Sequence, residues 1–195
     1  MSDLCSIGYA TKPLPVFMEQ LQTWRITAVA DIRSVPYSKR FHEYHREALE
    51  ARLRSARIPY VYLGAELGPR SKDPGHYDSK GQVQFERLQG SLSFRRGIER
   101  LQRGMAKGLR IAMLCAEKDP AICHRSLLVG DYLQAKHGIE TAHILHDGGL
   151  ESQRVLQHRL MDDHGIAPDL LRTEPECVRL AWRAQCRRFA YRRPG

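Results

Sequence analysis

The chain has 195 residues, of which 42% are hydrophobic, and this content excludes a disordered chain and is enough for a sizeable core. Its net charge of +9 indicates an anionic partner, because a basic surface attracts polyanions. No stretch of about 18 apolar residues and no secretory signal is present, and the five cysteines suit reduced thiols, so we expect no membrane span and a cytoplasmic location.

Apolar segments alternate with amphipathic segments along most of the chain. The segments typical of strands are 4–9, 26–32, 59–63, 109–114 and 140–145. The segments typical of helices are 13–22, 45–56, 85–107 with a break at Gly90-Ser91, 123–136, 150–163 and 175–191. We therefore predict an α/β fold with a mostly parallel, five-stranded, Rossmann-like sheet and helices on both faces.

The predicted elements divide the chain into two parts. Residues 1–148 are expected to form the α/β core domain, and residues 149–195 a C-terminal helical extension packed on it. The longest irregular stretch, 64–84, contains four Gly and two Pro, and loops of this length are usually functional or mobile. The sequence does not define an oligomeric state.

Polar residues follow three of the predicted strands. Gly8-Tyr9 ends the first strand, Asp31-Ile32-Arg33-Ser34 ends the second, and the turn 115–126 follows the fourth. Because parallel strands end at one edge of a sheet, and ligands bind there in open α/β sheets, we expect these residues to line one cleft.

The turn after the fourth strand carries the candidate catalytic groups. Cys115 is a candidate nucleophile, since a helix N-terminus and Arg125 would lower the pKa of its thiol, or else a small buried hydrophobe. Glu117 is a candidate general acid/base, or a loop carboxylate near a helix N-terminus. We expect His124 to carry protons. Asp31 is expected to orient a cation or act as a base, or else to form a structural ion pair.

An anionic substrate, such as a nucleotide, a nucleic acid or another phosphorylated molecule, follows from the charges around this cleft. We expect Arg33 and Arg125 to hold its anionic group. The other candidate substrate-binding residues are Tyr9, Ser34, Arg70, Cys123 and Ser126. The resulting prediction is an enzyme that binds an anionic substrate at the strand ends.

A metal site made of Cys115, Cys123 and His124 is an alternative, as is a thiol-based redox site. The spacing of the cysteines is not that of a standard zinc motif, and Cys123 and His124 would point apart if both lay on a helix. We therefore predict no metal and no cofactor.

The basic residues gather in two segments. Residues 33–57 contain seven Lys/Arg against three Asp/Glu, and residues 172–195 contain seven Arg against two Glu. A non-catalytic nucleic-acid-binding module is therefore a further alternative to an enzyme. The purely structural interpretation is that the last helix is amphipathic, packs by its apolar face and leaves its arginines in water. The candidate nucleic-acid-binding residues are Lys39, Arg40, Arg179, Arg183 and Arg187.

Four segments carry a family resemblance, namely 6–9, 31–36, 63–68 and above all 114–126. Together they resemble the family called domain of unknown function 488, over most of the chain. The resemblance implies a soluble bacterial or archaeal α/β domain with no settled activity. Where family members often have a Gly-Gly-Arg-like run, this chain has Leu67-Gly68-Pro69-Arg70. The family's signature residues correspond to Tyr9, Asp31, Arg33, Pro36, Cys115, Glu117, Cys123, His124 and Arg125.

Overall fold

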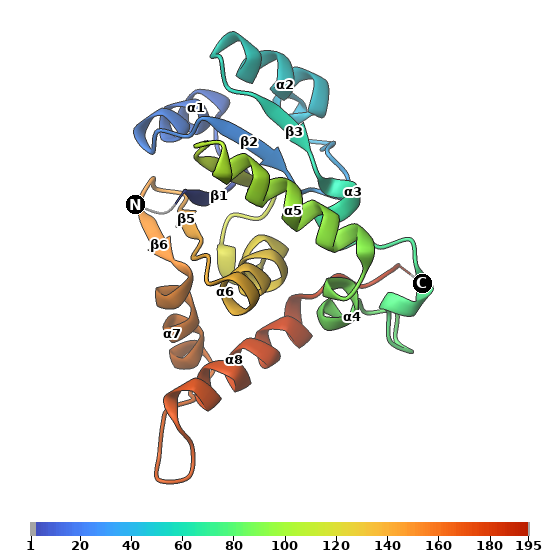
Figure 1. The fold of residues 1–195 in the computed structure, drawn as a ribbon, viewed down its shortest axis with the longest axis vertical. Helices are drawn as coiled ribbons and strands as arrows, with labels where there is room; N and C mark the ends of the chain where they lie inside the picture. The colour runs from blue at the N-terminus through green and yellow to red at the C-terminus, as the bar shows by residue number, and fades with distance from the viewer. Residues whose placement is uncertain (1–2, 195) are drawn as a thin grey trace.

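The computed structural model describes residues 3–194, and its centre is one twisted sheet (Figure 1). Within these residues the sheet has six strands in the order β3-β2-β4-β1-β5-β6. The first five are parallel to one another, and β6 runs antiparallel to β5. The strands are β1 (Leu4–Gly8), β2 (Ala28–Asp31), β3 (Tyr60–Tyr62), β4 (Ile111–Cys115), β5 (Ala142–Ile144) and β6 (Leu150–Ser152).

The predicted α/β fold with a mostly parallel sheet is confirmed, but the prediction of five strands is wrong. Residues 150–152, predicted as the start of a helix, instead form β6 and pair with β5. The reason lies at Ser152, whose side chain accepts a hydrogen bond from the backbone N–H of Val155 and caps α7 (Gln153–Asp163). The helix therefore begins three residues later than predicted.

Two layers of helices cover the sheet, because side chains alternate between its faces along each strand. On one face, α1 (Leu14–Thr23) and α2 (Arg46–Ser55) pack against residues such as Ile7 and Leu114. On the other face lie α5 (Leu92–Ala106), α6 (Asp131–His137), α7 and α8 (Glu174–Phe189), whose apolar residues share one cluster with Leu4 and Met113.

The predicted break at Gly90-Ser91 is confirmed. The short helix α4 (Phe85–Gln89) ends at Gly90, and the Ser91 side chain accepts a hydrogen bond from the backbone N–H of Phe94 to cap α5. The stretch 64–84, expected to be irregular, contains one short α-helix, α3 (Gly64–Leu67), and a 3₁₀ turn over Pro74–His76. No helix among residues 3–194 is long and apolar enough to cross a membrane.

The C-terminal tail returns to the stretch that precedes α4. The backbone N–H of Val83 donates to the carbonyl oxygen of Tyr191 at 2.9 Å, and that of Arg193 donates to Gly81 at 2.9 Å. In Figure 1 the C-terminal end of the chain accordingly lies beside α4. This pairing brings the last residues of the chain to the carboxyl edge of the sheet.

Candidate functional site

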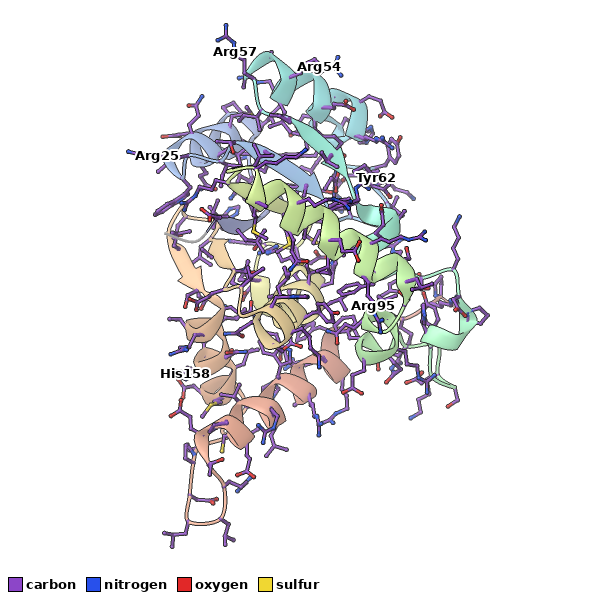
Figure 2. All side chains as sticks on the ribbon, viewed as in Figure 1. Arg25, Arg54, Arg57, Tyr62, Arg95 and His158 are labelled. Atoms are coloured by element: carbon purple, nitrogen blue, oxygen red, sulfur yellow. The ribbon has the colours of Figure 1, made fainter. Side chains whose placement is uncertain are left out.

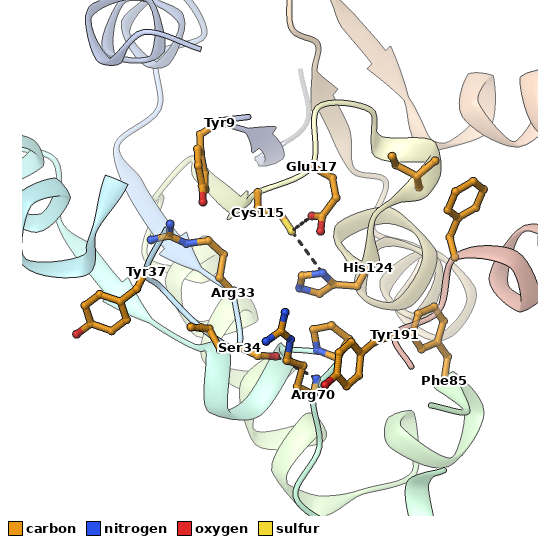
Figure 3. Close-up of a pocket in the computed structure, with 15 residues that line it drawn as sticks. Tyr9, Arg33, Ser34, Tyr37, Arg70, Phe85, Cys115, Glu117, His124 and Tyr191 are labelled. Carbon is orange, nitrogen blue, oxygen red and sulfur yellow. Dashed lines mark hydrogen bonds between the residues drawn. The ribbon is translucent and has the colours of Figure 1, made fainter. Parts of the chain in front are cut away.

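A pocket of about 380 Å³ opens where β1, β2 and β4 end (Figure 3). Its walls come from the strand ends, from the segment around Arg70, and from the end of the chain beyond α8. Its lining residues are Tyr9, Arg33, Ser34, Val35, Tyr37, Pro69, Arg70, Phe85, Cys115, Ala116, Glu117, Ile122, His124, Phe189 and Tyr191.

Two thiols, a carboxylate and an imidazole meet at one side of this pocket. The Sγ atom of Cys115, the last residue of β4, lies 2.9 Å from the Sγ atom of Cys123 and 2.7 Å from Oε2 of Glu117. The same carboxylate oxygen lies 3.1 Å from the Cys123 thiol. Nδ1 of His124 lies 3.4 Å from Sγ of Cys115 and 3.9 Å from Sγ of Cys123. One potential ligand atom from each of the four residues lies within 4.8 Å of the others.

The backbone between β4 and α6 explains why these side chains converge. A 3₁₀ turn over Pro120–Ile122 leaves Cys123 extended, at φ −123° and ψ 141°. His124 then has a helical conformation, at φ −63° and ψ −17°, and a π-helix over Arg125–Gly130 follows. The predicted helix over 123–136 is present as helical backbone from His124 to His137, but Cys123 lies outside it and its first part is π-helical. Because the backbone changes direction between Cys123 and His124, both side chains reach the same point.

Arg125 holds the loop that carries Glu117. Its side chain is fully buried, and its Nη1 and Nη2 groups donate to the carbonyl oxygens of Glu117 and Lys118 at 2.6 and 3.1 Å. Gly8 lets this loop approach β1, since a Cβ there would lie 1.9 Å from the Glu117 carbonyl oxygen. Ser126 is also fully buried and donates to the carbonyl oxygen of Pro120.

The imidazole of His124 has a defined orientation. Its Nε2 lies 2.9 Å from the carbonyl oxygen of Ile32, which can only accept, so this nitrogen carries the proton. Nδ1 faces the thiols and carries the lone pair when the ring is neutral. Burial lowers the pKa of His124, but the Cys123 thiol and the Glu117 carboxylate together raise it above its ordinary value. A backbone carbonyl behind the distal nitrogen is the arrangement that orients histidine ligands in metal sites.

The electrostatics of the cluster differ from the sequence-based prediction. Burial raises the pKa of the Cys115 thiol and raises that of Cys123 well above its ordinary value. The predicted lowering of the Cys115 pKa is therefore wrong: Arg125 does lower it, but burial is the larger effect. For Glu117, burial alone would raise the pKa, but the nearby His124 and the hydrogen bonds from both thiols hold it below its ordinary value.

Asp31 and Arg33 form an ion pair at the end of β2. The Nη2–Oδ2 distance is 2.5 Å, and the two side chains are 0% and 4% exposed. Arg33 also donates to the carbonyl oxygen of Tyr44 at 2.9 Å, and the Tyr60 hydroxyl donates to Asp31 at 2.5 Å. These contacts correspond to the structural interpretation of Asp31. They also use the hydrogen-bond donors of the Arg33 guanidinium group within the fold, just as the loop carbonyl oxygens use those of Arg125.

Arg70 is the arginine of the pocket whose guanidinium has no such partner within residues 3–194. Its backbone N–H donates to Oγ of Ser34 at 3.0 Å, which fixes the chain at the pocket wall. Its guanidinium lies 4.9 Å from the centre of the Tyr191 ring, and Figure 3 shows it in the pocket on the side of His124. Tyr9 stacks on Tyr44, with ring centres 4.4 Å apart.

Several aromatic residues of the pocket are not among the sequence-predicted site residues. Tyr37 and Phe189 are 50% and 36% exposed, and Phe85 and Tyr191 complete the wall. For Phe189 and Tyr191 the signal in the sequence is that both are aromatic and follow the arginines of the last predicted helix, and it does not show which surface they face. The pairing of the C-terminal tail with residues 81–83 holds Phe189 and Tyr191 at the pocket.

The fold and the site define the class of protein: an α/β domain with a Cys, Glu and His cluster at the carboxyl edge of its parallel strands. The family described as Domain of unknown function DUF488 matches residues 13–133, and the chain belongs to this family. The matched segment contains all four residues of the cluster. No curated protein matches the chain, and no solved structure does.

Proposed function

We propose that Cys115, Cys123 and His124 bind a zinc ion, and that the protein is a zinc-dependent hydrolytic enzyme for an anionic substrate. The observation that carries the proposal is the convergence of the four groups within 4.8 Å. Two thiolates bound tetrahedrally to zinc at about 2.3 Å lie about 3.8 Å apart. The observed Sγ–Sγ distance of 2.9 Å and the Sγ–Nδ1 distances of 3.4 and 3.9 Å need shifts of less than about 1 Å to reach that geometry.

The donor set favours zinc over magnesium and calcium, and over a dithiol redox site. Thiolate and imidazole ligands select zinc against magnesium and calcium, which prefer oxygen. A redox pair needs only the two sulfurs, whereas here a carboxylate and an imidazole of fixed tautomer complete the cluster. A metal site uses all four groups.

Glu117 is the residue we assign to proton transfer. A zinc ion bound by two cysteines and one histidine, with a glutamate beside it, is the arrangement in zinc-dependent nucleobase deaminases. Zinc supplies there a water molecule whose pKa is lowered to about 7. Glu117 lines the pocket and its Oε2 lies 2.7 Å from the Cys115 Sγ, so its carboxylate would stand beside a bound ion, placed to accept that water's proton. With zinc bound, Glu117 would hold the proton taken from the water and would pass it to the leaving group as the water oxygen bonds to the substrate carbon.

Arg70 supports the assignment of an anionic substrate. It is the cationic side chain that lines the pocket and has no hydrogen bond or ion pair to another described residue. Arg33 and Arg125 act in the fold through their bonds to Asp31 and to loop carbonyls. We therefore assign recognition of the substrate's anionic group to Arg70.

The test is the metal content of the purified chain, measured by elemental mass spectrometry after loading with zinc and removal of the excess. We expect about one zinc per chain, and less than a tenth of that in Cys115→Ser and Cys123→Ser. Cys186→Ser is the matched control, because this thiol lies on α8 outside the cluster and its loss leaves the zinc content unchanged. A wild-type chain that retains no zinc would refute the proposal.

A further inference from the structure

A second cavity, of about 400 Å³, lies between α4 and α8. Phe85 lines both this groove and the site pocket. Around the end of α8, Arg187 and Ala190 line the groove, whereas Phe189 and Tyr191 line the pocket. The two cavities therefore adjoin, separated by the Phe85 ring and by the last turn of α8.

We infer that this groove binds the backbone of a single-stranded nucleic acid, one base of which enters the site pocket. The inference names the substrate class of the proposed enzyme and rests on that proposed function only for the chemistry, since binding in the groove needs no zinc. It keeps Arg183 and Arg187 from the predicted nucleic-acid-binding residues, and it departs from the assignment of the substrate's anionic group to Arg33 and Arg125.

Two arginines of α8 supply the cations of the groove. Arg183 and Arg187 are exposed, and neither has an ion-pair partner among the described residues. Four residues apart, they lie about 6 Å from each other along one face of the helix. Arg87 adds a third positive charge, held in place by its bonds to the carbonyl oxygens of Gly75 and Tyr77.

The charge of the groove stays positive when its acidic residues are included. Glu86 and Asp131 line the groove as well, against the three arginines. Arg70 continues the positive charge on the pocket side of Phe85. Arg179, one turn earlier on α8, does not line the groove. A nucleic-acid chain that follows these cations would run from the surface of α8 to the Cys, Glu and His cluster.

Aromatic side chains distinguish a nucleic acid from an acidic peptide. Sites for single-stranded nucleic acid combine a positive groove with aromatic rings on which bases stack. Here Phe189, Tyr191 and Tyr37 line the pocket at the end of the cationic track, and Phe189 and Tyr37 are 36% and 50% exposed. A volume of about 380 Å³ is within the range of small-molecule sites and admits one nucleotide.

The experiment is the binding of a fluorescein-labelled single-stranded DNA of about 15 nucleotides, followed by anisotropy as salt is raised. If Arg70, Arg183 and Arg187 contact one phosphate each, affinity falls about 20-fold between about 50 and 200 mM salt. In R183Q/R187Q the fall over that interval shrinks to about threefold. R25Q/R57Q removes the same charge from the opposite end of the molecule (Figure 2) and leaves the 20-fold fall unchanged.

A second variant tests the stacking. Phe189→Ala is expected to weaken binding about tenfold, and Phe189→Leu as much, because leucine keeps the apolar bulk but has no ring face. Equal binding of a polyglutamate peptide, equal salt dependence in R183Q/R187Q, or tight binding by Phe189→Ala would each overturn the inference. Zinc content is measured on the same samples, so a failure in the groove is distinguishable from a failure of the metal site.

Discussion

Asp131 provides a quantitative test of the electrostatics around the α4–α8 groove. It is the first residue of α6. Burial raises the pKa of its carboxyl group from 3.8 to about 6, although a hydrogen bond from Gln89 lowers that pKa in part. A carboxyl group with a raised pKa binds its proton more tightly in the folded chain, so stability falls as the pH rises through about 6. A difference of about 2 pKa units corresponds to a cost of about 3 kcal/mol at neutral pH, which partial exposure reduces to about 2 kcal/mol.

The perturbation is Asp131→Asn, which removes the charge and keeps an oxygen for the hydrogen bond from Gln89. We expect the free energy of unfolding in urea to rise by about 2 kcal/mol at pH 7.5, and the gain to shrink to about 1 kcal/mol or less at pH 4.5. Asp162→Asn, at an exposed carboxylate of α7, is the control and should change stability by less than about 0.5 kcal/mol. A gain that does not depend on pH, or a loss at pH 7.5, would refute this reasoning.

Three further predictions concern the cluster and the ion pair beside it. Glu117→Gln should retain zinc but lower turnover of a hydrolysed substrate at least about 100-fold, measured beside the zinc content of the same sample. Asp31→Asn should lower the free energy of unfolding by about 3–5 kcal/mol in urea titrations, because it leaves the buried Arg33 guanidinium without its counter-charge. Zinc binding at pH 7.5 should release about two protons, since burial raises the pKa of the Cys115 and Cys123 thiols; calorimetry in buffers of different ionisation enthalpy counts them.

The general position of the site follows from the sequence, because it depends on the order of the strands. Apolar segments that alternate with helical ones predict a parallel sheet, and polar residues after β1, β2 and β4 then meet at one edge. In the structure Gly8 pairs with Cys115 and Asp31 pairs with Leu114, so these strand ends are neighbours. The sequence predicts that Tyr9 and Cys115 share this edge, whereas their direct proximity depends on β1 and β4 being neighbours, which the sequence does not show.

The chemistry of the cluster does not follow from the sequence, because it depends on a local backbone change that tertiary contacts hold in place. Helical periodicity predicts one helix from Cys123 onward, in which Cys123 and His124 diverge. The 3₁₀ turn that makes them converge is held by the Asp119 side chain, which accepts from the N–H of Ala121, and by the bonds between Arg159 and Asp119. Arg159 lies 40 residues away on α7, and sequence periodicity does not reveal such a partner.

The sequence also does not show which arginines bind a ligand and which stabilise the fold. A positive charge beside a predicted cleft favours an anion-binding role, and Arg33, Arg70 and Arg125 all have that position in the sequence. Whether an arginine is free to bind a ligand depends on how many of its donors the fold already uses. Arg33 and Arg125 are 4% and 0% exposed and donate to carboxylate or carbonyl oxygens, whereas the Arg70 guanidinium only contacts the Tyr191 ring.

The site is built from two parts of the chain, and this division affects how the choice of substrate could differ between related chains. The Cys, Glu and His cluster lies within residues 13–133, which match the family, whereas Phe189, Tyr191 and the arginines of α8 lie beyond them. The tail reaches the pocket only through its pairing with residues 81–83, so this wall can vary without disturbing the strands that carry the cluster. We therefore expect the metal chemistry to be common to chains that share the cluster, and the choice of substrate to depend on the helix and tail that follow it.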